Sequence, residues 1–233
     1  MKKMLNIFDD SQNKSIQVET ETVEKEITIG EFLKENSLKS ELISNEKAWD
    51  RYQELYNEDN DIIPVIIDGE YDLVITNLDE NIHQKITDSN ETIFNETLLK
   101  EYQDEFDDTV NNLIRRNLDD DVDFENETVL IVKLNIKHPY EILKIIPFGG
   151  FNDCPSPQKH YEVAKRWYEK YNAVPIIIGK DFIQYYMKET IINKDMLRQI
   201  VCEQCCYCTP EEQTVKELAN TTYSSKFWYF WWD

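Results

Sequence analysis

An amide, a carboxylate and a thiol follow one another in the most turn-rich segment of the chain, residues 148–157. They are Asn152, Asp153 and Cys154, and they come just before a predicted helix that carries His160. A helix N-terminus can lower the pKa of a cysteine and favour the nucleophilic thiolate, and a nearby histidine can transfer the proton. Cys154, Asp153, Asn152 and His160 are therefore the candidate catalytic residues of the sequence.

The same segment could hold a small ligand. Adjacent glycines let the backbone approach a bound molecule closely, and large aromatic side chains could line such a site. The candidate ligand-binding residues are Gly149, Gly150, Phe151, Trp167 and Trp231, with Phe148 beside them.

A purely structural interpretation competes with both of these functions. Asp153 or Ser156 would cap the following helix, and Cys154 would be a small buried hydrophobic residue. No nucleophile signature of a known enzyme family surrounds this cysteine. We therefore favour the structural interpretation and keep the enzyme or ligand-binding site as the alternative.

The remaining cysteines form the pattern C-x2-C-C-x-C at Cys202, Cys205, Cys206 and Cys208. Thiolate sulfur is a zinc ligand, but structural zinc sites usually combine two separated pairs of ligands. On a helix the first three would share one face while Cys208 points elsewhere. The spacing favours a buried cysteine-rich helix face in a reducing compartment over a metal site.

No other motif predicts a cofactor. The histidines His83, His138 and His160 have no shared metal or triad spacing. The acidic run 119–127 resembles a calcium loop but lacks the glycine that an EF-hand requires. The pair Gly149-Gly150 alone is not a nucleotide fingerprint. We therefore predict neither a metal nor an organic cofactor.

Charge is distributed unevenly along the chain. The formal net charge is −21, and residues 1–127 hold 34 Asp and Glu against 12 Lys and Arg, while residues 128–233 hold 12 against 13. An acidic surface keeps a protein soluble and can also steer a cationic partner. The carboxylates that we expect to contact such a partner are Asp104, Glu105, Asp107, Asp108, Asp119, Asp120 and Asp121.

The same composition disfavours other partners and locations. Nucleic acid is excluded as a partner because phosphate contacts need clustered Lys and Arg. No apolar window approaches the length of a membrane span, and the apolar start of the chain is too short for a signal peptide. With 41% hydrophobic and 12% aromatic residues the chain is globular, and we expect it in the cytoplasm, away from membranes.

The hydrophobic periodicity predicts a mixed order of helices and strands. Predicted helices cover 30–43, 47–56, 98–118, 139–146, 158–171, 193–207 and 211–220. Predicted strands cover 62–67, 71–78, 128–134, 173–178 and 182–187. These elements must position the loop 148–157 and the acidic residues. Their order predicts the α+β class, with a central mixed sheet flanked by helices.

The C-terminal residues 227–232 are all aromatic, and such a run is costly to leave in water. We predict that they form the strand that closes the sheet. Because side chains alternate along a strand, Trp228, Phe230 and Trp232 would lie on one face and Phe227, Tyr229 and Trp231 on the other. Since both sets are apolar, we expect both faces to be covered.

Several C-terminal landmarks occur together in one order. They are the segment Gly-Gly-Phe-Asn-Asp-Cys-Pro at 149–155, the segment 166–173, the pairs Glu203-Gln204 and Tyr207-Cys208, and the tail 228–233. In that order and spacing they resemble the bacterial domain-of-unknown-function family DUF4253 over residues 128–233, with a weaker resemblance from about residue 47. The chain departs from the family pattern in the cysteines that precede Tyr207-Cys208. The resemblance implies a C-terminal domain and no established reaction.

Taken together, the sequence predicts an acidic α+β region at 1–127 and a DUF4253-like domain at 128–233. The charge asymmetry and the lack of a catalytic signature favour a non-enzymatic interaction protein. Its most concrete form is a bacterial immunity protein that neutralises a cationic toxin. The alternative is an enzyme or small-ligand-binding protein that uses the loop 149–154.

Overall fold

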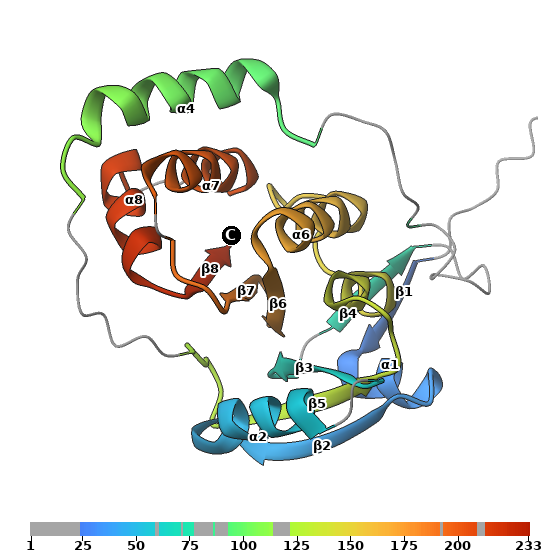
Figure 1. Cartoon of the computed structure of the whole chain (residues 1–233). Coiled ribbons are helices and arrows are strands. Elements are labelled where there is room, and N and C mark those ends of the chain that lie inside the picture. The colour runs from blue at the N-terminus through green and yellow to red at the C-terminus, as the bar shows by residue number, and fades with distance from the viewer. Residues whose placement is uncertain are drawn as a thin grey trace, which may run out of the picture.

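Strands from both halves of the chain form one six-stranded sheet with the order β2-β5-β3-β6-β7-β8 (Figure 1). The computed structural model describes residues 24–58, 61–70, 72–76, 86, 93–113, 122–191, 193–208 and 213–233. The sheet strands are β2 (Lys39–Ser44), β3 (Ile63–Asp68), β5 (Thr128–Leu134), β6 (Ala173–Ile178), β7 (Phe182–Met187) and β8 (Phe227–Trp231). All neighbours are antiparallel except β3 and β6, which are parallel. The sheet is therefore mixed, as predicted, but it is open, so the expectation that the aromatic tail closes the sheet was wrong.

A second, two-stranded sheet pairs β1 (Glu24–Thr28) with β4 (Asp72–Thr76). The helices are α1 (Ile29–Glu35), α2 (Asn45–Glu58), α4 (Glu96–Thr109), α5 (Ile142–Ile145), α6 (Pro157–Tyr171), α7 (Lys194–Tyr207) and α8 (Val215–Ser224), with a 3-10 turn at Pro139–Glu141. This combination confirms the predicted α+β class.

The two faces of the sheet are covered by different helices. On one face α2 packs against β2, β3 and β5, and its Ala48 and Tyr52 belong to the same buried cluster as Ile66 and Ile131. The opposite face carries the larger core, built with α5, α6 and α7. Both β3 and β6 are buried at every position, as expected for central strands rich in β-branched residues. The core therefore lies on both sides of the strand pair β3–β6.

Helix α6 has sequence signals at both ends. The Ser156 hydroxyl accepts a hydrogen bond from the Lys159 N–H at 3.3 Å, and Pro157 follows in the first turn, where its missing N–H costs nothing. At the other end Asn172 adopts the left-handed conformation, with φ 54°, that ends many helices. Of the two predicted caps for this helix, Ser156 is the one used.

The prediction of a single helix over residues 30–43 was wrong in its second half. Helix α1 ends at Glu35, Ser37 takes a positive φ of 55°, and residues 39–44 form strand β2. The reason lies elsewhere in the chain, because β2 completes the sheet by pairing along its whole length with β5. Tertiary pairing outweighs the local helical pattern here.

The aromatic tail forms strand β8, but the expectation that both of its faces are covered was wrong. Trp228, Phe230 and Trp232 are 3%, 5% and 6% exposed, whereas Tyr229 and Trp231 are 43% and 44% exposed. Among the described strands β8 pairs with β7 and has no second neighbour. It is an edge strand, and the Trp49 ring of α2 contacts its first residue, Phe227.

Helix α4 lies outside α7 and α8 (Figure 1) and buries one stripe against them. Phe106 and the adjoining Val110 are fully buried, and Leu99, Tyr102 and Leu113 pack beside them. The helix stops at Thr109, within the segment predicted as helical over 98–118. Residues 114–118 lie outside the part of the chain that the structure describes.

Candidate functional site

The loop at 148–157 folds tightly on itself before helix α6. The Gly150 N–H donates to the Pro155 carbonyl at 2.8 Å, and the Cys154 N–H donates to the Phe151 carbonyl at 2.8 Å. Gly149 and Gly150 have φ values of 94° and 85°, which L-residues rarely adopt. A Cβ at Gly149 would also collide with the Pro155 carbonyl and the His160 ring. These glycines are therefore required by the packing of the loop itself.

The loop brings Cys154 and His160 together and adds a partner that the sequence did not predict. The Cys154 Sγ lies 3.3 Å from His160 Nε2, and His160 Nδ1 lies 2.6 Å from the Tyr207 hydroxyl. A thiol, an imidazole and a phenol thus form one hydrogen-bonded chain. Tyr207 comes from the end of α7, and only its place beside Cys208 in the family landmarks marked it in the sequence.

Burial keeps the thiol, the imidazole and the phenol of this hydrogen-bonded set neutral. It raises the pKa of the Cys154 thiol to about 12 and lowers the pKa of His160 to about 3. It also raises the pKa of Tyr207 well above its usual value. The rings of Phe148, Tyr207 and Trp232 enclose the imidazole at centroid distances of 4.8, 5.4 and 5.2 Å. At neutral pH the site therefore holds a thiol and a neutral histidine, without a thiolate.

The other two candidate catalytic residues lie at the surface. Asn152 and Asp153 are exposed, whereas Cys154 is buried. The Asn152 side-chain amide donates to the Asp233 carbonyl at 2.9 Å, which ties the end of the chain to the loop. The structure thus separates Asn152 and Asp153 from the pair formed by Cys154 and His160.

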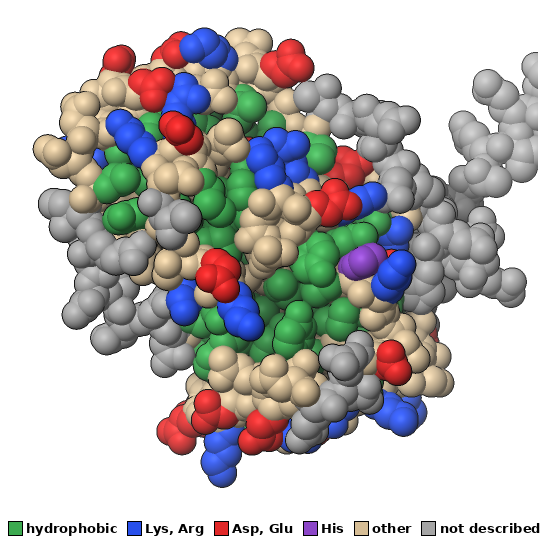
Figure 2. Space-filling view, in the orientation of Figure 1, with side chains coloured by type: hydrophobic (Ala, Val, Ile, Leu, Met, Phe, Trp, Pro, Cys, Tyr) green, Lys and Arg blue, Asp and Glu red, His purple; other side chains and the backbone are tan. Residues whose placement is uncertain are grey.

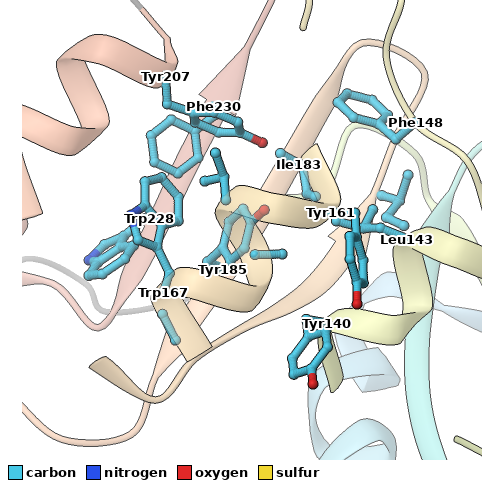
Figure 3. Close-up of a cluster of buried hydrophobic side chains, with 14 of the residues drawn as sticks. Tyr140, Leu143, Phe148, Tyr161, Trp167, Ile183, Tyr185, Tyr207, Trp228 and Phe230 are labelled. Carbon is cyan, nitrogen blue, oxygen red and sulfur yellow. The ribbon is translucent and has the colours of Figure 1, made fainter. Parts of the chain in front are cut away.

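The candidate ligand-binding aromatics also occupy different environments. Trp167 is fully buried in the cluster of Figure 3, where its ring contacts Trp228 and Phe230 at 5.5 and 5.3 Å. Trp231 is 44% exposed and belongs to the opposite face of β8. Phe151 is half-buried against Phe148 at 6.0 Å. The structure does not gather these residues around one cavity.

A buried carboxylate that sequence reasoning missed lies next to this cluster. Glu203, on α7, is 2% exposed. It accepts hydrogen bonds from Arg166 Nη2 at 2.7 Å, from Lys170 Nζ at 3.2 Å and from the Trp167 indole at 3.0 Å. Hydrogen bonding to this carboxylate raises the pKa of Arg166. Glu203 therefore joins α6 to α7, and the pair Glu203-Gln204 in the family landmarks was its one signal.

Two of the four cysteines at the end of α7 face the core. Cys202 and Cys205 are fully buried, and Cys206 and Cys208 are half-buried. Burial raises the pKa of Cys202 and Cys205 to about 12 and that of Cys206 to about 11, so these sulfurs are thiols at neutral pH. Among the described residues no group of three or more His, Cys, Asp or Glu side chains could hold a metal ion.

Four of the predicted partner-binding carboxylates are exposed on α4. They are Asp104, Glu105, Asp107 and Asp108. Asp107 pairs with Arg198 of α7 at 2.7 Å, which lowers the pKa of this carboxyl, and Asp104 pairs with Lys100. The other predicted carboxylates, Asp119, Asp120 and Asp121, lie outside the described residues.

A pocket of about 370 Å³ that the sequence did not predict opens between α2, α6 and the strands β6 and β7. Five aromatic rings line it: Trp49, Tyr52, Tyr56, Tyr168 and Tyr186. Figure 2 shows hydrophobic side chains gathered in the middle of this face of the molecule, above α2. Trp49, Tyr52 and Tyr56 share one face of α2 by their helical spacing, a pattern that is more typical of a core face than of a pocket wall. Tyr56 is in fact 42% exposed.

The open mixed sheet with helices on both faces defines an α+β protein. Residues 130–233 match the family described as Domain of unknown function (DUF4253), which confirms the resemblance found in the sequence. No curated protein and no solved structure matches the chain. Among the described residues, no helix is long and apolar enough to cross a membrane.

Proposed function

We propose that the protein is a non-enzymatic binding protein that contacts a cationic protein partner through the outer face of α4. One observation carries the proposal. Glu105 and Asp108 are exposed in the last turns of a helix that has no basic residue in its final turn. Negative charge at a helix C-terminus opposes the helix dipole and costs local stability. The exposed carboxylates at this end of α4 concentrate negative potential, which would attract a cationic partner.

The concrete biological form that we propose is a bacterial immunity protein that neutralises a cationic toxin in the cytoplasm. An acidic surface attracts the basic cleft of an enzyme that acts on nucleic acid and speeds association by electrostatic steering. The charge imbalance of residues 1–127, 34 acidic against 12 basic, supports this form. The alternative interpretation is that the acidic residues only keep the protein soluble, and it implies no specific partner.

The second candidate is an enzyme or small-ligand-binding protein that uses the loop 149–154. The 3.3 Å distance between Cys154 Sγ and His160 Nε2 favours it, because a nucleophile and a base need such contact. Burial opposes it, since the raised pKa of Cys154 and the lowered pKa of His160 both work against a thiolate–imidazolium pair. We therefore rank it below the interaction role.

A charge-neutralised variant tests the interaction role. Glu105→Gln with Asp108→Asn removes carboxylates from α4, and Asp50→Asn with Glu169→Gln removes the same charge from other exposed positions. The full chain is used to capture basic proteins from the lysate of its native cell at low and at moderate salt. We expect the wild type and the control to retain a basic partner at low salt and the α4 variant to lose it. Equal capture by both variants, or capture indifferent to salt, would overturn the proposal.

A further inference from the structure

The aromatic pocket beside α2 has walls that meet at a steep angle. On α2 the Trp49 and Tyr52 rings are stacked at 5.2 Å with 13° between their planes, and the Tyr52 and Tyr56 rings at 6.0 Å with 14°. Tyr186, on β7, stands at 67° to the Trp49 ring, 5.2 Å away. Tyr168 of α6 also lines the pocket. The three α2 rings thus form one stack along the side of the pocket, and the Tyr186 ring crosses the end of the stack.

This geometry favours a rounded group over a flat one. A planar ligand such as a nucleobase gains most when it stacks between parallel aromatic faces. Stacking occupies the faces between the α2 rings and leaves no gap for a planar ligand, whereas a compact group can contact the outer surfaces of the stack and of Tyr186. Aromatic faces carry negative electrostatic potential, and cages of Trp and Tyr recognise quaternary ammonium groups. The pocket volume of about 370 Å³ lies in the range of small-molecule sites.

The polar groups of the pocket fit the same class of ligand. Gln53, Asn57 and Asn172 contribute neutral amides, and Lys188 and Glu189 are exposed residues that also line it. The ammonium group of Lys188 alone would attract an anionic ligand only weakly, because the chain has a net charge of −21. Burial raises the pKa of Tyr52 and Tyr56, so their phenols stay neutral and the rings remain the main recognition surface.

We propose that the pocket between α2, α6 and β7 binds a quaternary ammonium group, with Trp49, Tyr56 and Tyr186 as its aromatic walls and Glu189 as the nearby anion. The group can belong to a free choline-like molecule or to a trimethylated lysine side chain, which share this chemistry. The site is separate from the acidic face of α4 and does not depend on the proposed protein partner.

Calorimetric titration of the full chain compares each cation with a neutral or less methylated counterpart. Choline is paired with 3,3-dimethylbutan-1-ol, which has the same shape without the charge, and a trimethyllysine peptide is paired with the unmodified peptide. We expect at least one cation to bind about tenfold or more tightly than its counterpart, as cation–π contacts in a partly desolvated site allow. The pair that shows this difference identifies the source of the group. If neither pair differs, or if only the neutral alcohol binds, the proposal is wrong.

Two pairs of variants locate the binding site. Trp49→Ala should weaken binding of the preferred cation about tenfold or more, while Trp231→Ala, which removes an exposed tryptophan from β8, should leave it unchanged. Glu189→Gln should weaken and Lys188→Gln should strengthen binding, each about two- to fivefold, because exposed charges act through solvent. Since these rim residues are exposed, their variants are expected to fold. Equal effects of Trp49→Ala and Trp231→Ala, or rim effects of the reverse sign, would place the ligand elsewhere and overturn the proposal.

Discussion

At the scale of single residues, the pair Cys154 and His160 shows how proximity differs from activation. Their atoms lie 3.3 Å apart, yet the environment that holds them is apolar and closed. A reactive cysteine needs an electropositive and partly open surrounding. Here a histidine with a lowered pKa supplies no charge, so the hydrogen-bonded chain to Tyr207 serves to satisfy buried polar groups.

We therefore expect Cys154 to react slowly with an alkylating reagent at neutral pH. Burial raises the pKa of its thiol to about 12, and only the thiolate is strongly nucleophilic. Alkylation of the native chain with iodoacetamide, located by peptide mass mapping, should be far slower at Cys154 than in the denatured chain. Faster reaction in the native chain would contradict this expectation and support an enzyme that uses the loop 149–154.

His160 gives a prediction for the pH dependence of stability. Its pKa is about 3 in the folded state and about 6.5 in an unfolded chain, so below about pH 6.5 the unfolded state binds one more proton. The stabilisation is complete above the unfolded pKa and is lost as the pH falls toward the folded pKa. Between pH 7 and pH 5.5 the free energy of unfolding should fall by about 1 kcal/mol through this residue.

Urea unfolding at both pH values measures this loss. The variant His160→Gln keeps a neutral hydrogen-bonding side chain and should show a pH dependence smaller by about 1 kcal/mol over that interval. The same dependence in the variant and the wild type would mean that His160 takes up its proton without unfolding.

At the scale of elements, one buried charge contributes to the contact between α6 and α7, beside the hydrogen bond of His160 to Tyr207. Glu203 is 3% exposed in its side chain and holds Arg166 and Lys170, which are 35% and 37% exposed. Replacing it with glutamine removes the charge that these cations share and weakens the bond from the Trp167 indole. Because breaking a buried ion pair costs about 3–5 kcal/mol and these cations are partly solvated, we expect Glu203→Gln to lose about 2–3 kcal/mol of unfolding free energy.

Denaturant unfolding of Glu203→Gln and of Glu169→Gln gives the comparison. Glu169 is exposed on α6, and its variant should stay within about 0.5 kcal/mol of the wild type. A loss for Glu203→Gln no larger than that of the control would show that this ion network adds nothing to the contact between the helices.

Most elements could be predicted from local patterns, and the misses share a cause. Strands β5, β6 and β7 and helix α6 were predicted nearly to the residue, because their apolar periodicity, caps and turns all agree. The strand β2 and the edge position of β8 depend on which strand lies beside them, and a local pattern carries no such information. The same limit applies to the sites. Cys154 and His160 lie close in sequence, whereas Tyr207, Glu203 and the aromatic pocket depend on contacts between distant helices.

At the scale of the whole molecule, the six-stranded sheet joins the two regions that we predicted at 1–127 and 128–233. Strand β5, just after the predicted boundary, lies between β2 and β3 from before it. The matched family region begins at residue 130, inside β5. We expect a sheet shared in this way to couple the stability of the acidic region to that of residues 130–233.

We therefore predict that deleting residues 228–233 leaves the whole chain unfolded, the acidic region included. The deletion removes Trp228, Phe230 and Trp232, whose rings contact Trp167, Tyr207 and His160 on the larger core. Each large buried aromatic side chain contributes about 3–5 kcal/mol, against a typical total stability of about 5–15 kcal/mol. Circular dichroism should show loss of both helix and strand signal, with no cooperative melt.

A pair of single substitutions separates the burial of these rings from the mere length of the chain. Phe230→Ala should cost about 3–5 kcal/mol, whereas Trp231→Ala, at a side chain that is 44% exposed, should cost about 1 kcal/mol or less. Positions 230 and 231 are adjacent in β8 and differ in the face of the strand on which their side chains lie. Equal losses from the two substitutions, or a truncated chain that melts cooperatively near the wild-type temperature, would mean that the tail is not part of the core. The expected result would instead show that one face of an edge strand joins the sheet, α6 and α7 into one folding unit.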